Sequence, residues 1–209
     1  MKWLWLPVAA ACAGAAEAPK IFYSKSFPGS SPAYVAITVD RSGAADYRES
    51  PEEDAGIKFQ LTPKEVDEVF SLVEKLGRFT RPLESGLKVA RTGTKTFRYQ
   101  SEKETHEVQF NYSLDPDARL LWDFFERVSE TERHLVKLER AARFDRLGVN
   151  EALLELEVSH DRNRLVAPQQ FLKVLDRIAR NESYLHMARA RAAKLAESIR
   201  GAAASSPQP

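Results

Sequence analysis

The fold is decided by residues 34–48, which read YVAITVDRSGAADYR. Val35, Ile37 and Val39 alternate with other residues, so a strand here would place all three side chains on one face. The run Asp40-Arg41-Ser42-Gly43 is typical of a hairpin turn, and residues 44–48 then return as the partner strand. The stretch therefore predicts two antiparallel strands with one buried face.

Other strands are predicted on both sides of this hairpin. Residues 20–27 alternate before it, and residues 56–60 form a short strand after it. Residues 94–100 and 104–112 form a second hairpin. The side chains expected to meet across the second hairpin, over a core, are apolar or aromatic: Phe97, Tyr99, Val108, Phe110 and Tyr112.

Helix starts are marked by capping residues. Thr62 fits the N-cap position, Pro63 the first helical position, and Glu65 completes a capping box. Gly77 ends that helix. A longer helix opens at Asp115-Pro116-Asp117, where we expect the cluster of Trp122, Phe124 and Phe125 to pack under the sheet.

From residue 120 to residue 200 the pattern is helical almost throughout, with breaks near residues 147–148, 167–168 and 181–183. The fold class is therefore α+β. We expect a two-layer structure in which an antiparallel sheet of two hairpins plus a short strand has helices on one face, followed by a helical C-terminal extension.

The chain is expected to divide into four segments: a signal peptide (1–18), an α+β domain (19–130), a helical extension (131–200) and a disordered tail (201–209).

The first residues predict export. Lys2 is followed by fourteen uncharged residues and then by small residues of the kind that signal peptidase accepts. The stretch is shorter than the roughly 20 apolar residues of a membrane-spanning helix, so we expect no transmembrane segment. Cleavage after Ala15 or Ala16 is favoured over Ala18, which Pro19 follows. In the alternative, residues 8–12 act as a lipoprotein box and Cys12 carries the lipid.

Composition excludes several classes of function. Cys12 is the only cysteine, so the mature chain has no disulfide or thiolate site, and this favours a bacterial envelope protein. The formal net charge of +1 is unlike that of a nucleic-acid-binding protein. Charge is nevertheless uneven, because residues 49–75 are acidic and residues 161–200 are basic.

The segment 27–34, FPGSSPAY, with residues 35–40, Gly43 and Tyr47, resembles a family of uncharacterised exported bacterial domains. Their first hairpin opens with a loop of the form C-F-G-x-C-P-x-Y. The resemblance covers residues 21–128, but Phe27 and Ser31 stand where the family has its cysteines. It implies the fold and export, and no activity.

No catalytic pattern stands out. The four histidines, among them His106, lack metal-site spacing, so no metal or other cofactor is expected. Ser85 and Lys88 match S-x-x-K, but in a stretch that reads as a loop.

The leading interpretation is a non-enzymatic binding or interaction protein of the cell envelope, periplasmic or secreted, whose partner is another envelope protein. The candidate interaction surface consists of five basic residues on and beside the last helix: Arg180, Arg189, Arg191, Lys194 and Arg200. Peripheral membrane contact by that helix is a weaker alternative, because its apolar stripe is rich in alanine.

Two other functions stay open. One is an envelope hydrolase, which a pocket joining His106 to acidic residues of the loop at residues 50–55 would favour. The other is a lipid-anchored assembly factor tethered through Cys12.

Overall fold

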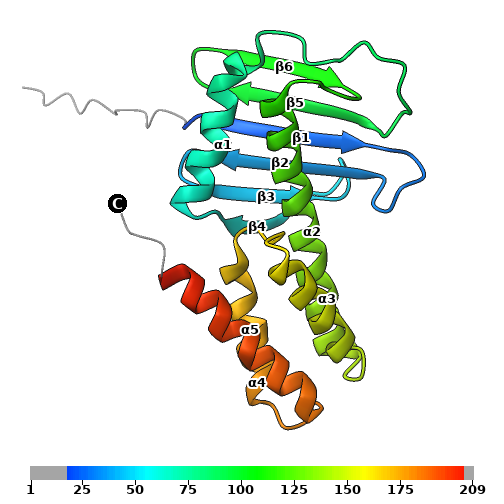
Figure 1. Ribbon diagram of the computed structural model, residues 1–209, viewed down its shortest axis with the longest axis vertical. Helices are drawn as coiled ribbons and strands as arrows, with labels where there is room; N and C mark the ends of the chain where they lie inside the picture. The colour runs from blue at the N-terminus through cyan, green and yellow to red at the C-terminus, as the bar shows by residue number, and fades with distance from the viewer. Residues whose placement is uncertain (1–17, 205–209) are drawn as a thin grey trace, which may run out of the picture.

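The computed structural model describes residues 18–204, and within this range six strands form one antiparallel sheet (Figure 1). The strands are β1 (Lys20–Ser26), β2 (Tyr34–Asp40), β3 (Ala44–Arg48), β4 (Ile57–Gln60), β5 (Thr94–Gln100) and β6 (Thr105–Phe110). Their order across the sheet is β4-β3-β2-β1-β5-β6. Each hairpin predicted from the sequence is present, and β1 joins the two by pairing with β2 and β5.

The register places the predicted apolar residues on one face. Tyr23 at the centre of β1 pairs with Ile37 on one side and Phe97 on the other, and all three are fully buried. Phe97 pairs in turn with Val108 of β6. One expectation is corrected here, because β6 ends at Phe110 and Tyr112 lies beyond the strand.

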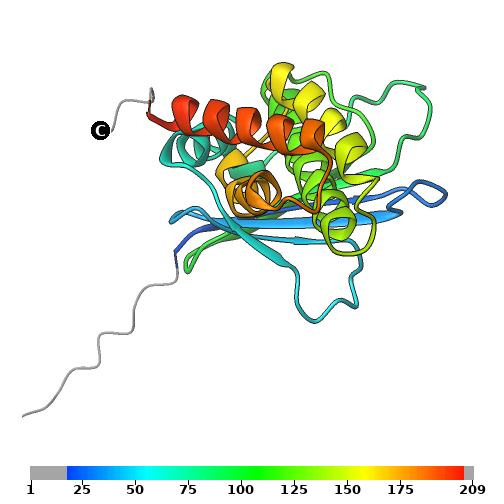
Figure 2. The same cartoon turned by 90° about the horizontal axis from the view of Figure 1, so that it is seen from below.

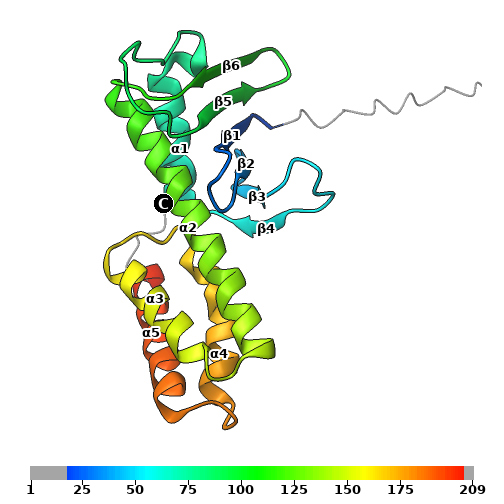
Figure 3. The ribbon, with the colours of Figure 1, turned by 90° about the vertical axis from the view of Figure 1, so that its right-hand side faces the viewer.

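Two helices cover this face of the sheet, as predicted: α1 (Pro63–Lys75) and the first half of α2 (Pro116–Phe144). Seen edge-on in Figure 2, the sheet has all the helices on one side. Figure 1 shows α1 and α2 crossing the sheet side by side, and Figure 3 shows both on the same side of the strands. The capping box at Thr62 and Glu65 is present, and the Asp115 carboxylate accepts two backbone N–H groups at the start of α2.

Aromatic rings join α2 to the sheet. Phe125 stacks on Tyr23 with the ring centres 4.8 Å apart and meets the edge of Phe124 at 5.7 Å. Phe124 and Phe125 are fully buried and Trp122 is partly buried, so this cluster packs under the sheet as predicted. Stacked and edge-to-face pairs of this kind add to the stabilisation that burial provides.

The remaining helices form a second core. They are α3 (Val149–Asp161), the short 3-10 helix η2 (Pro168–Phe171), α4 (Leu172–Arg180) and α5 (His186–Ala204). Their buried side chains pack against each other and against Leu138 and Ala141 of α2. We call residues 18–130 the sheet part and residues 131–204 the helical part; α2 runs unbroken through the boundary between them.

The segment that follows α3, up to and including η2, attaches the helical part to the sheet part. We call residues 162–171 the strap. Val166 and Ala167 of the strap are buried in the core of the sheet part, not in that of the helical part. The Ala167 N–H donates to Glu65 Oε1 at 2.8 Å, and the Gln169 side chain donates to the Gln60 carbonyl at 3.0 Å. The strap thus binds both α1 and the end of β4.

The structure corrects the expected start of the C-terminal tail, and it does not describe the expected signal peptide. The helix α5 continues to Ala204, so residues 201–204 of the expected tail are helical. The signal peptide, Cys12 and residues 205–209 lie outside the described residues. Among residues 18–204, no helix has both the length and the apolar character needed to cross a bilayer.

Candidate functional site

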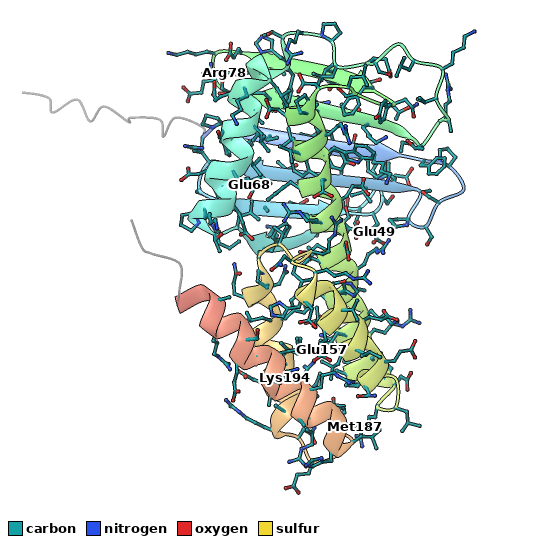
Figure 4. The ribbon with its side chains drawn as sticks, in the orientation of Figure 1. Glu49, Glu68, Arg78, Glu157, Met187 and Lys194 are labelled. Atoms are coloured by element: carbon teal, nitrogen blue, oxygen red, sulfur yellow. The ribbon has the colours of Figure 1, made fainter. Side chains whose placement is uncertain are left out.

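Four of the five basic residues named as a candidate surface contact a neighbouring helix of the same chain; the exception is Arg180 of α4. Arg191 and Lys194 both contact the Glu157 carboxylate of α3, at 2.8 and 3.1 Å (Figure 4 labels Glu157 and Lys194). Arg200 binds Asp176 of α4 at 2.6 Å, and the charge of Arg180 helps to lower the pKa of that carboxyl.

The fifth of these residues, Arg189, directs Nε toward the Ala179 carbonyl at 3.5 Å. The other four basic residues therefore each interact with a carboxylate of the helical part, which is Glu157 or Asp176. The basic face predicted from the sequence is largely compensated within the fold.

The pocket that would favour a hydrolase does not form. His106 lies on β6, at one edge of the sheet. The acidic loop leads from β3 into β4, at the opposite edge. Ser85 and Lys88 lie in an extended loop without helical structure, so Lys88 is not held one helical turn from Ser85.

A polar groove between α2 and α3 was not predicted. It encloses about 540 Å³ and is lined by residues of both helices and by Arg164 of the strap. His134 Nε2 lies 2.9 Å from Ser159 Oγ, and the Ser159 hydroxyl donates to Glu130 at 2.9 Å. Serine, histidine and a carboxylate thus come together from two helices.

This arrangement does not have the geometry of a catalytic triad. In a triad the carboxylate binds the histidine and leaves the serine proton to the histidine base. Here the Glu130 carboxylate accepts the hydrogen bond of the Ser159 hydroxyl directly and lies 4.0 Å from His134 Nε2. Burial lowers the pKa of His134 and so favours its neutral ring. Because the Ser159 hydroxyl donates its hydrogen to Glu130, Ser159 Oγ faces His134 as an acceptor. Arg164 binds the second Glu130 oxygen at 3.1 Å, so the cluster joins α2, α3 and the strap.

A second polar cluster surrounds Glu126 under the sheet. Tyr23, Lys25 and Trp122 all donate to its carboxylate, at 2.8 to 3.0 Å. Burial opposes ionisation of Glu126, but these donors outweigh burial and lower the pKa of the carboxyl. Lys95 is fully buried over the Trp122 ring, and burial lowers its pKa.

Lys95 also donates to the Asn111 carbonyl at 2.7 Å and to Thr92 Oγ1 at 3.2 Å. These acceptors tie Lys95 to the loop at residues 92–93 and to Asn111. Within residues 18–204, no group of three or more histidine and acidic side chains is placed to hold a metal ion.

The far end of the helical part carries exposed apolar side chains and exposed arginines. We call it the apolar–arginine end. Phe144 and Leu147, where α2 leads into α3, are 81% and 76% exposed, and Met187 at the start of α5 is 58% exposed. The Tyr184 hydroxyl donates to the Ala142 carbonyl at 2.7 Å and holds the two connections together. Figure 1 shows both at the end of the molecule remote from the sheet, and Figure 4 labels Met187 there.

Arg143 and Arg146 precede Phe144 and Leu147 directly in the sequence. The two segments of this end, residues 139–147 and 180–189, contain five arginines against three carboxylates. Arg140, Arg143 and Arg146 are all exposed. Asp145 uses its carboxylate locally, because Oδ1 accepts the Gly148 N–H at 3.0 Å. The end therefore combines exposed apolar area with positive charge.

A weak signal for this surface is present in the sequence. Phe144 follows the apolar stripe of the long helix but lies off its spacing, and Leu147 comes after the helix has ended. Large apolar residues that do not fall on the buried apolar face of a helix, and that each follow an arginine, indicate an exposed apolar patch. Met187 gave no such signal, because it falls within an apolar helical pattern.

Comparison of the chain with family models, with curated proteins and with solved structures finds no match.

Proposed function

We propose that the chain is an exported, non-enzymatic interaction protein of the bacterial envelope that binds a partner protein through the apolar–arginine end. The exposure of Phe144 and Leu147 carries this proposal. Each is a large side chain at a helix end, where a polar residue would satisfy the fold equally well.

Burial in a partner would stabilise a complex. Covering apolar area yields about 25 cal/mol per Å², and aromatic and arginine side chains contribute most to protein interfaces. Arg140 and Arg146 form no ion pair within residues 18–204. We therefore expect the partner to offer an apolar pocket bordered by carboxylates that pair with these two arginines.

A protein partner fits this end better than a membrane. Glu139, Asp145 and Glu182 lie among the arginines, and an anionic lipid surface would repel them. A protein interface accommodates both signs of charge around an apolar centre. The groups in the groove between α2 and α3 are committed to one another, so nothing there favours the hydrolase alternative.

The test is site-specific photo-crosslinking of the full chain in its native host. The crosslinker replaces Leu147 or Met187, and Leu87 serves as the matched control because it is also apolar and exposed (53%) but belongs to the sheet part. We expect one shared protein adduct from Leu147 and Met187 and none from Leu87. Adducts that do not depend on position would contradict the proposal.

Reconstitution with the purified partner then tests the charge. Exchanging Arg140→Glu together with Arg146→Glu should weaken binding at least tenfold, while Lys88→Glu in the sheet part should leave it unchanged. Binding to phosphatidylglycerol vesicles is measured in parallel. If the protein binds the vesicles through Leu147 and forms no protein adduct, the partner is a membrane and the proposal is wrong.

A further inference from the structure

In addition to its buried side chains and the ion pairs of Arg164, the strap makes several single hydrogen bonds to elements distant in sequence. Besides its contacts with Glu65 and Gln60, the Val166 N–H donates to Thr131 Oγ1 at 3.0 Å. The Gln170 side chain donates to Glu132 Oε1 at 2.9 Å. Thr131 and Glu132 lie on α2 between the two cores, so the strap is attached where the sheet part meets the helical part.

Glu132 is an unusual residue for this position. It is fully buried, and its second oxygen, Oε2, has no hydrogen-bond partner among the described residues. No lysine or arginine forms an ion pair with it within residues 18–204. A carboxyl group in this setting is better accommodated neutral than ionised.

The groups that face Glu132 do not neutralise it. From η2 the Gln170 amide donates to Glu132 and by itself lowers the pKa of the carboxyl group, but burial has the larger effect. From β3 the facing group is Tyr47, whose hydroxyl donates to Glu49 and which senses the charges of both Glu132 and Arg133. Arg133, on α2 itself, has an exposed side chain. Burial consequently raises the pKa of Glu132 to about 7.

We infer that the burial of Glu132 against the strap makes a proton-dependent latch: the strap stays closed while the carboxyl group is protonated and opens more often once the proton is lost, because opening returns the carboxylate to water. The inference is independent of the proposed interaction surface, because it concerns how the two parts of the chain are fastened. A protein exposed to the external medium would meet the pH range in which the latch works.

Local opening is the expected response, not unfolding of the whole chain. Each part has a core of its own, and α2 continues through both. Ala167 adopts a left-handed conformation (φ 49°, ψ 49°), which is unfavourable for a residue with a Cβ atom. Opening of the strap would relieve this strain at Ala167.

Hydrogen exchange measured by mass spectrometry on the full chain tests the latch. The readout is the protection of the Val166 and Ala167 amides, corrected for the intrinsic exchange rate at each pH. A group with a pKa of about 7 in the latched state and 4.5 when released increases opening roughly 70-fold between pH 5 and pH 8. The increase should level off above pH 7.

Matched variants separate the latch from general pH effects. Glu132→Gln should abolish the pH dependence, and Glu139→Gln, on the same helix but partly exposed, should retain it. Equal pH dependence in wild type and Glu132→Gln would overturn the inference. If Glu132→Gln does not fold, the ¹³C shift of the Glu132 carboxyl in the wild-type protein decides: titration near pH 7 supports the latch, and titration below pH 5 refutes it.

Discussion

Two phenylalanines on the same helix should respond in opposite ways to the same substitution. Phe125 is fully buried and its ring packs on Tyr23, Phe97 and Phe124. Phe144 is 81% exposed at the other end of α2. Replacement by alanine removes the same atoms from each position, so the difference in unfolding free energy measures burial alone.

The magnitude follows from the packing. Removing a buried phenylalanine costs about 3–5 kcal/mol, and the stacked contact of Phe125 with Tyr23 places it in the upper half of that range. Phe144→Ala should change stability by no more than about 0.5 kcal/mol, as is usual for surface substitutions. Helix propensity slightly favours alanine at both positions.

Urea unfolding followed by far-UV circular dichroism measures both variants. With a slope of about 2 kcal/mol per M, Phe125→Ala should lower the midpoint by about 2 M, while Phe144→Ala leaves it in place. A loss above about 1.5 kcal/mol for Phe144→Ala would refute the reasoning. Phe144 would then be packed within the fold, and the apolar–arginine end would not be free to bind a partner.

The remaining predictions concern three side chains with ionisable or reactive groups. Since burial raises the pKa of Glu132 from 4.5 to about 7, the native state keeps a proton that the unfolded chain has lost between those values. Stability should thus fall by about 2.5 kcal/mol between pH 5 and pH 8 in urea unfolding, and Glu132→Gln should remove that fall; a fall of the same size in the variant would assign it to other groups. Glu126→Leu leaves the buried Tyr23 hydroxyl without its acceptor, so thermal unfolding should show a loss of about 1–3 kcal/mol, and no loss would mean that Tyr23 finds another acceptor. Cys12→Ser should leave the mass of the mature protein unchanged, with residue 16 or 17 first; an acylated Cys12 in the wild type would instead establish the lipid-anchored alternative.

Much of the sheet part could be predicted because its signals are local. The alternation around Ile37 and Phe97 sets the face that each strand buries, and both hairpins form as expected. The caps at Thr62 and Asp115 act within one helical turn, so both helix starts are correct. The end of β6 was placed too late, because an alternating pattern continues past the last residue that pairs with β5.

The candidate sites were less predictable because they depend on contacts between distant residues. The basic side chains of the last helix were expected to form a free surface. Arg191 instead binds Glu157, 34 residues earlier, and Arg200 binds Asp176. A charge count along the sequence does not reveal such pairing, since it contains no information on which helix packs against which.

The sequence by itself determined the positions of most strands and helices and the face that each strand buries. It also predicts an export signal. These depend on periodicity and capping within a few residues. Only the tertiary structure decided that His106 and the acidic loop lie at opposite edges of the sheet, that the strap inserts Val166 and Ala167 into the first core, and that Phe144 stays exposed. The physical reason is that strand order and helix docking join residues about 100 positions apart, such as Ala167 and Glu65, whose contact depends on the whole fold.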